Sequence, residues 1–140
     1  MGTPHEVLFP WDDQYCLGIS FADVQHQQLA DSINRLHQAL LDGREKIVIG
    51  RALEELITYS KAHFAAEEKV LLSYGYPDFL SHHSEHECLA YAVLELYQKI
   101  MSGEVRLNTF AVTFLKDWLR EEILRADTKF APFLKGKGVP

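Results

Sequence analysis

The sequence has few cysteines and no surplus of basic residues. Its two cysteines, Cys16 and Cys88, are far apart and show no CxxC spacing, which excludes a disulfide framework and a zinc-ribbon motif. We therefore expect free thiols in a reducing compartment. The formal net charge is −6. This charge argues against binding to nucleic acid or to an anionic membrane, because both partners require a basic surplus on the protein.

Long hydrophobic runs are also absent. No apolar stretch approaches the roughly 18 residues that a membrane-spanning helix needs. The N-terminal residues form neither a basic cluster nor an apolar segment, so we expect no signal peptide. Together these absences predict a soluble, cytoplasmic protein. The chain has 140 residues, of which 47% are hydrophobic, and it is therefore expected to form one domain, 1–140, around a single core.

Helical periodicity dominates what is present. Apolar residues, joined by histidine and glutamate, recur at alternating spacings of three and four, which is typical of one helix face. The expected helices cover about 21–42, 46–74, 79–102 and 105–129. Short connections that contain Gly43, Gly75 and Gly103 separate them, so successive helices should be antiparallel neighbours. The sequence thus predicts an all-α fold, an up-down-up-down four-helix bundle.

The two ends of the chain differ from the helical part. Residues 1–20 contain two prolines among scattered aromatic residues, which favours an ordered N-terminal arm over a helix. Ser20 or Asp23 is expected to cap the first helix. The bundle is placed at 21–131, and the tail at 132–140 begins with a proline, which cannot continue a regular helix.

Strong metal donors continue the inward apolar stripes of the expected helices. They are His26 in the first helix, His63 and Glu67 in the second, His82 and His86 in the third, and Glu122 in the fourth. The second and third helices each carry two donors four residues apart, and this spacing puts both on one face, about one turn apart. Glu121 competes with Glu122 for the inward position, and the spacing from Trp118 favours Glu122.

Imidazoles and carboxylates buried together are costly unless a partner satisfies them. A metal ion does so, and a mixture of nitrogen and oxygen donors suits iron, manganese or zinc. The donors are too many for one tetrahedral zinc, so the sequence predicts a dinuclear site in the bundle core. His83, Glu68 and Glu85 are expected at the surface, where either carboxylate can act as an outer partner of the site.

The order and spacing of the donors resemble the hemerythrin family, in particular its bacterial single-domain members. The family pattern is a lone histidine on the first helix, HxxxE on the second, HxxxH on the third and HxxxxD on the fourth. This sequence supplies His26 and the segments 63–67 and 82–86. Its fourth motif has Glu122 in place of the histidine, followed by Asp127. An ideal α-helix places Asp127 about 140° around from Glu122, so only the resemblance singles Asp127 out.

The resemblance implies two iron ions joined by an oxo or hydroxo bridge, with manganese or mixed-metal occupancy as an alternative. By the family pattern, one iron would be held by His26 and His63, the other by His82, His86 and Glu122, and both would be bridged by Glu67 and Asp127. The function implied is carriage, storage or sensing of O2, or binding of another diatomic molecule or a peroxide. An external electron donor and a monomer or weak oligomer are also expected.

The glutamate at position 122 has chemical consequences. An anionic oxygen donor in place of a neutral nitrogen adds about one negative charge to a site of low dielectric constant. Ferric iron is thereby stabilised relative to ferrous iron. We hypothesise a lower reduction potential and faster autoxidation than a histidine would give. A chelating Glu122 would also close the coordination position that O2 requires.

Three other functions compete with O2 binding. The carboxylate-rich donor set also suits a di-iron redox enzyme, such as a peroxidase, a nitric oxide reductase or a ferroxidase-like protein. A metal-dependent sensory module is the second alternative, although such modules are usually fused to signalling domains. A metal-free helical interaction domain is the third, and it would keep its fold without metal. Turnover of peroxide or nitric oxide would distinguish the enzyme from an O2 carrier.

Overall fold

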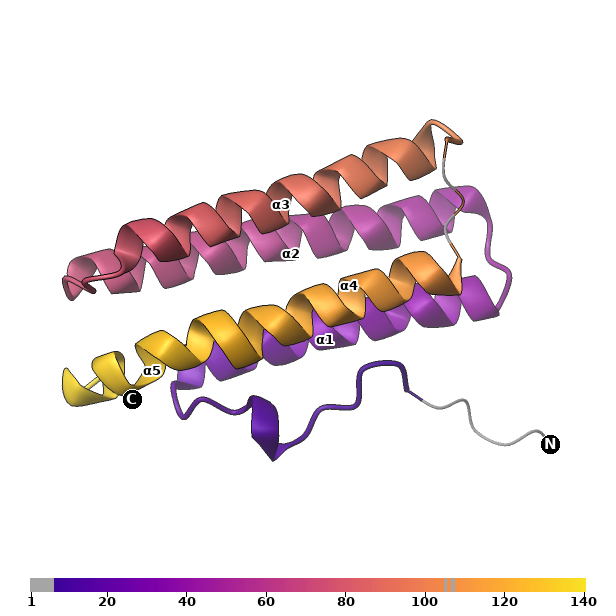
Figure 1. Ribbon diagram of the computed structural model, residues 1–140. Helices are drawn as coiled ribbons and strands as arrows, with labels where there is room; N and C mark the ends of the chain where they lie inside the picture. The colour runs from indigo at the N-terminus through magenta and orange to yellow at the C-terminus, as the bar shows by residue number, and fades with distance from the viewer. Residues whose placement is uncertain (1–6, 105, 107) are drawn as a thin grey trace.

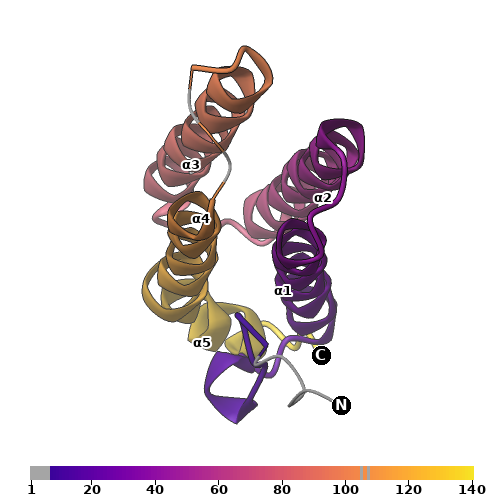
Figure 2. The same ribbon diagram turned by 90° about the vertical axis from the view of Figure 1, so that its right-hand side faces the viewer.

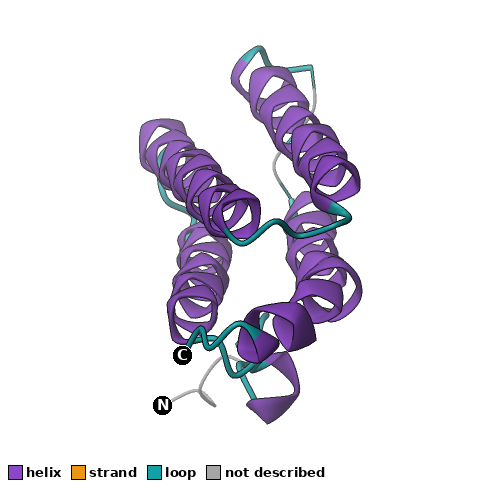
Figure 3. Cartoon of the chain, turned by 90° about the vertical axis from the view of Figure 1, so that its left-hand side faces the viewer, coloured by secondary structure: helices purple, strands orange, loops and turns teal. Residues whose placement is uncertain are grey.

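The computed structural model describes residues 7–104, 106 and 108–140, except for the side chains of residues 109 and 125–128. Within this part of the chain it contains helices and loops and no strand (Figures 1 and 3). The elements are η1 (Asp13–Tyr15), α1 (Ser20–Leu41), α2 (Lys46–Ser73), α3 (Phe79–Met101), α4 (Thr109–Glu121), η2 (Glu122–Asp127) and α5 (Thr128–Gly136). Among the described residues, no helix has the length and apolar character needed to cross a membrane.

The long helices form an antiparallel bundle. Helix α1 packs against α2 and α4, and α2 packs against α3. A view along the bundle shows α1 and α2 on one side and α3 and α4 on the other (Figure 2). The all-α, up-down-up-down four-helix bundle predicted from the periodicity is therefore confirmed.

Helices α1 and α2 each end two residues before a glycine that the sequence marks as a helix stop. Gly43 has a φ of 65° and Gly75 a φ of 70°, in the left-handed region that glycine enters without steric cost. A Cβ added at either position would meet nothing within 4 Å. The backbone conformation, and not crowding, therefore explains glycine at both turns.

The described part of the N-terminal arm is tied to α1. The backbone N–H of Phe9 donates to Asn34 Oδ1 at 2.8 Å, and Asn34 Nδ2 donates to the Phe9 carbonyl at 3.0 Å. The Phe9 ring is buried and lies 5.1 Å, between centroids, from the ring of Tyr15. The prediction of an ordered arm is confirmed for these residues.

The expectation that Asp23 or Ser20 caps the first helix is wrong. Ile19 occupies the cap position, and no side chain caps it. The Asp23 carboxylate instead accepts hydrogen bonds from the backbone N–H groups of Leu17 (2.7 Å) and Gly18 (3.0 Å). The side chain turns back toward the arm because Leu17, which it holds in place, is buried in the core.

The last part of the chain departs most from the sequence prediction. The fourth helix starts at Thr109, with Asn108 Oδ1 accepting a hydrogen bond from the N–H of Ala111 at 3.1 Å. The expected start at 105 lies outside the described residues, and the described residues 106 and 108 are not helical. It passes into the π-helical turn η2 and then into α5, which includes Pro132 and continues to Gly136. The tail expected at 132–140 is thus partly helical.

Burial explains why helix α5 continues past its proline. Phe130 and Leu134, on either side of Pro132, are fully buried. The free energy gained by burying these side chains offsets the cost of the one backbone hydrogen bond that proline cannot donate. The carbonyl of Pro140 also accepts a hydrogen bond from the N–H of Ser20 at 3.1 Å. The C-terminus is therefore held at the start of α1 (Figure 1).

Candidate metal centre

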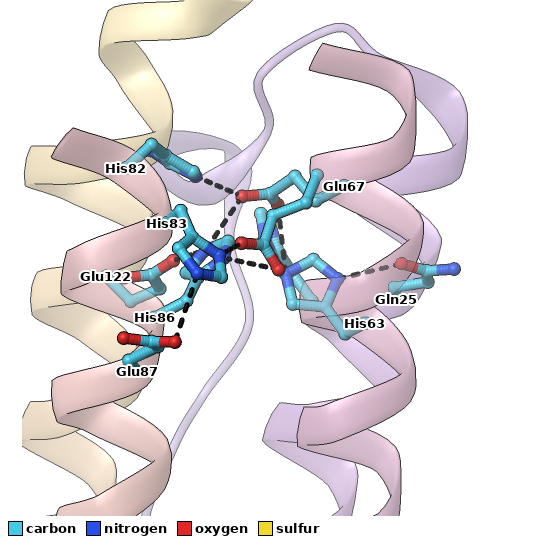
Figure 4. Close-up of polar contacts among 10 residues, drawn as sticks. Gln25, His63, Glu67, His82, His83, His86, Glu87 and Glu122 are labelled. Atoms are coloured by element: carbon cyan, nitrogen blue, oxygen red, sulfur yellow. Dashed lines mark hydrogen bonds and ion pairs between the residues drawn. The ribbon is translucent and has the colours of Figure 1, made fainter. Parts of the chain in front are cut away.

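Six of the seven side chains singled out by the sequence meet in the interior of the bundle, and Figure 4 labels five of them, all except His26. They are His26 from α1, His63 and Glu67 from α2, His82 and His86 from α3, and Glu122 from the start of η2. None is more than 5% exposed. Each continues the apolar stripe of its own helix, so the packing that buries the stripe also carries the polar groups into the core.

Glu67 lies at the centre of this group. Its Oε1 is 2.5 Å from Nε2 of His82 and 3.2 Å from Nε2 of His86. Its Oε2 is 3.0 Å from Nε2 of His63 and 3.6 Å from Nε2 of His26. Each oxygen of one carboxylate thus faces its own pair of imidazoles, and the donors fall into two sets that share Glu67.

The two sets are compact. In the first, the donor atoms of His26, His63 and Glu67 lie within 4.8 Å of one another. In the second, those of Glu67, His82, His86 and Glu122 do so as well. The Nε2 atoms of His26 and His63 are 3.0 Å apart. Two imidazole nitrogens that converge in this way can direct their lone pairs at one cation.

Glu122 occupies the inward position that the spacing from Trp118 predicts, and Glu121 is exposed. Glu122 Oε1 is 2.8 Å from Nε2 of His86. Its Oε2 is buried and has no hydrogen-bond partner among the described residues. A buried carboxylate oxygen without a partner is costly, and a metal ion in the second donor set would satisfy it.

The charges in the centre are strongly coupled. Burial alone would raise the pKa of Glu67, but hydrogen bonds from four imidazoles hold that pKa well below its usual range. Burial lowers the pKa of His86, and hydrogen bonds to Glu122 and Glu67 outweigh this and raise it to about 10. Burial lowers the pKa of His26, against an opposing hydrogen bond to Glu67. The Glu67 carboxylate therefore remains ionised and available as a ligand.

Asp127 is the seventh predicted side chain, and it lies outside the described side chains. Its backbone is described and ends the π-helical turn that begins at Glu122. In such a turn the hydrogen bonds run from residue i to residue i+5, so positions 122 and 127 are one turn apart along the backbone. The 140° offset calculated for an ideal α-helix does not apply here.

Polar side chains outside the centre lie beside two of the histidines, and one of them makes a hydrogen bond. Oε1 of Gln25 accepts a hydrogen bond from Nδ1 of His63 at 2.8 Å, and this contact orients the ring so that Nε2 faces the centre, where a metal ion would take its lone pair. Oε2 of Glu68 lies 3.7 Å from Nδ1 of His86. Sequence reasoning named Glu68 as a possible outer partner but gave Gln25 no role. The position of Gln25 immediately before His26 in the sequence does not predict a contact with α2.

His83 is outside the centre, as predicted. Its side chain is 42% exposed and contacts Glu68 and Glu87. Aromatic rings shield the buried histidines instead. Phe64 stacks on His86 with ring centroids 4.1 Å apart, and Phe130 meets His82 edge-on at 5.4 Å. Phe130 was missed by sequence reasoning, which ended the last helix just before it.

The donors fit a pair of metal ions of the iron, manganese or zinc type. Imidazole nitrogens and carboxylate oxygens suit these ions. One carboxylate shared between two compact donor sets gives each ion its own ligands. The aromatic rings of Phe64 and Phe130 cover two of the donor imidazoles, those of His86 and His82.

Comparison with known proteins agrees with this geometry. The Hemerythrin HHE cation binding domain family matches residues 17–134. Bacteriohemerythrin of Methylococcus capsulatus (strain Bath) is 34% identical over 121 residues, covering 86% of this chain and 92% of that protein. Bacteriohemerythrin of Stenotrophomonas maltophilia (strain R551-3) is 30% identical over 128 residues, covering 91% and 82%. The crystal structure of a wild-type hemerythrin superposes with a TM-score of 0.82 at 33% identity, covering 88% of this chain and 95% of that one. The chain therefore belongs to the hemerythrin family.

Proposed function

We propose that the chain binds two iron ions in the bundle core and, through them, O2. The observation that supports this most strongly is the position of Glu67. One of its oxygens faces His26 and His63, and the other faces His82 and His86. A carboxylate placed between two sets of imidazoles fits a bridging ligand in a dinuclear centre. O2 binding is typical of the family.

In this proposal each side chain has a definite role. His26 and His63 would hold one ion, and His82, His86 and Glu122 would hold the other, with the carboxylates of Glu67 and Asp127 available to both. Bound iron supplies the redox chemistry with O2. The protein orients the donors and excludes water: Gln25 fixes the ring of His63, and Phe64 covers that of His86. Manganese in place of iron, a cytoplasmic location and an external electron donor remain predictions.

A second candidate is a di-iron redox enzyme that turns over peroxide, nitric oxide or ferrous iron. Glu122 favours it, because this carboxylate is buried beside His86 and adds negative charge to one donor set. Such charge favours the ferric state and shortens the life of any reversible complex with O2. Both candidates use the same metal site. The O2-binding protein holds its ligand reversibly, whereas the enzyme consumes O2 or peroxide after it reaches the iron.

The test is the metal content of the purified protein, together with the visible spectrum of the reduced form before and after addition of O2. About two irons per chain and an O2-dependent absorption band that persists would support O2 binding. Two irons with immediate conversion to the oxidised spectrum, and with turnover of added peroxide, would favour the redox enzyme. One metal ion or none would refute the dinuclear site.

A further inference from the structure

A cavity of about 300 Å³ opens on the seam between α3 and the junction of α4 with η2. Its lining includes Ser81, Ser84, Glu85 and Cys88 of α3, together with Glu121 and Glu122. Ser84, Cys88 and Glu121 are exposed and Glu85 is half-buried, whereas Glu122 is only 3% exposed. The cavity thus runs from the surface to a donor of the metal centre.

Glu122, the most buried residue of the lining, carries a side-chain oxygen that no described protein group satisfies. Glu122 Oε1 is engaged with His86 (Figure 4). Its Oε2 has no hydrogen-bond partner in the described part of the chain. This oxygen distinguishes the cavity from a surface hollow that happens to be acidic, because it marks a position where a cation is needed.

The charged side chains that the structure describes in the lining of this cavity are all acidic. Three carboxylates line the cavity and, among the described residues, no lysine or arginine does. The neighbouring hollow at His82 contains Lys129, and a cavity of about 400 Å³ between the α1–α2 and α3–α4 connections is lined by Arg44, Lys46 and Arg106. A confined acidic opening concentrates cations, and carboxylate and hydroxyl oxygens are suitable ligands for a hydrated divalent metal ion.

We propose that this cavity is the route by which divalent metal ions load the centre. A hydrated Fe²⁺ ion binds first to the carboxylates of Glu85 and Glu121, exchanges water for protein oxygens, and passes to the free oxygen of Glu122. The proposal rests on the proposed function, because it requires that metal binds at Glu122. It adds a path and a first binding site to that function.

Cys88 gives a direct test, because its thiol is free, exposed and part of the lining. In a Cys16→Ser variant, a bulky maleimide attached to Cys88 should block the cavity. We expect anaerobic uptake of Fe²⁺ by the metal-free protein, followed with a competing chromophoric chelator, to slow about tenfold or more. The final iron content should be unchanged. A Cys88→Ser variant labelled on the exposed Cys16 is the matched control and should load at the native rate.

The charge of the opening is tested separately. Glu85→Gln with Glu121→Gln should slow Fe²⁺ uptake about tenfold at low ionic strength. The difference should shrink near 1 M salt, where the screening length is about 3 Å. The control is Glu55→Gln with Glu95→Gln, which removes the same charge from exposed surface ion pairs away from the cavity.

The outcomes separate this inference from the proposed function. If the labelled and the charge-reduced proteins reach two irons per chain as fast as their controls, the loading route is wrong and the dinuclear site stands. If the native protein takes up no Fe²⁺, the proposed function fails and the route fails with it. Slow uptake in both variants, with normal uptake in both controls, supports the route.

Discussion

Replacing Glu122 with histidine should raise the reduction potential of the iron centre. The donor atoms of Glu67, His82, His86 and Glu122 all lie within 4.8 Å of one another, so an ion among them lies closer than that to the Glu122 carboxylate. Glu122→His removes about one negative charge at this range. A unit charge at about 4 Å contributes about 4 kcal/mol at an effective dielectric constant of about 20.

That energy sets the size of the expected shift. For a one-electron step, a tenfold change in equilibrium corresponds to about 1.4 kcal/mol and about 59 mV. An interaction of about 4 kcal/mol therefore corresponds to roughly 170 mV. Since rearrangement of the neighbouring ligands absorbs part of it, we expect the measured potential of Glu122→His to rise by on the order of 100 mV. Autoxidation in air should slow accordingly.

The assay is a spectroelectrochemical titration of the iron-loaded protein, with autoxidation monitored by absorbance after mixing with O2. Glu121→His is the matched control, because it makes the same chemical change at the exposed neighbouring position. Its potential should stay within about 20 mV of the native value, since exposed charges are screened by water and salt. Equal potentials and equal autoxidation rates in Glu122→His, Glu121→His and the native protein would refute the assignment of Glu122 as a metal ligand.

Other contacts give three further predictions. Gln25→Ala should lower iron affinity about 10- to 100-fold by releasing the His63 ring, with Gln27→Ala as the exposed control, and chelator competition measures both. Asn34→Ala should lower the free energy of unfolding by about 1–3 kcal/mol in chemical denaturation, because two backbone groups of Phe9 lose their partner. In the metal-free protein the pKa of His86 is raised to about 10, so a proton competes with iron below that pH. Affinity should therefore fall as pH decreases, and calorimetry in buffers of different ionisation enthalpy should detect proton release on binding.

The inward positions of the centre could be predicted because they depend only on helical spacing. His63 and Glu67 share a face in any regular α-helix, and so do His82 and His86. The same spacing distinguished the buried Glu122 from the exposed Glu121. Such arguments succeed for long periodic helices, where the apolar stripe and the donor positions coincide.

Contacts that depend on tertiary packing could not be predicted from spacing. Asp23 has the residue type and position of a helix cap, yet it binds the backbone of the arm. Pro132 signals a helix end, yet α5 continues through it because its neighbours are buried. In both cases a local preference of a few kcal/mol or less yields to packing that the local sequence does not encode.

The π-helical turn at Glu122 shows that a spacing which does not fit an α-helix can itself indicate the local backbone structure. A separation of five residues between Glu122 and Asp127 fits no single face of an α-helix. The backbone resolves the misfit by switching to i+5 hydrogen bonding over Glu122–Asp127, which puts the two positions one turn apart. A π-turn interrupts the regular i+4 hydrogen bonding of an α-helix and is frequently found at functional sites. The five-residue interval between Glu122 and the proposed donor Asp127, in a chain whose proposed donor pairs on α2 and α3 are spaced by four, is therefore better understood as a sequence signal for the turn than as weak helical periodicity.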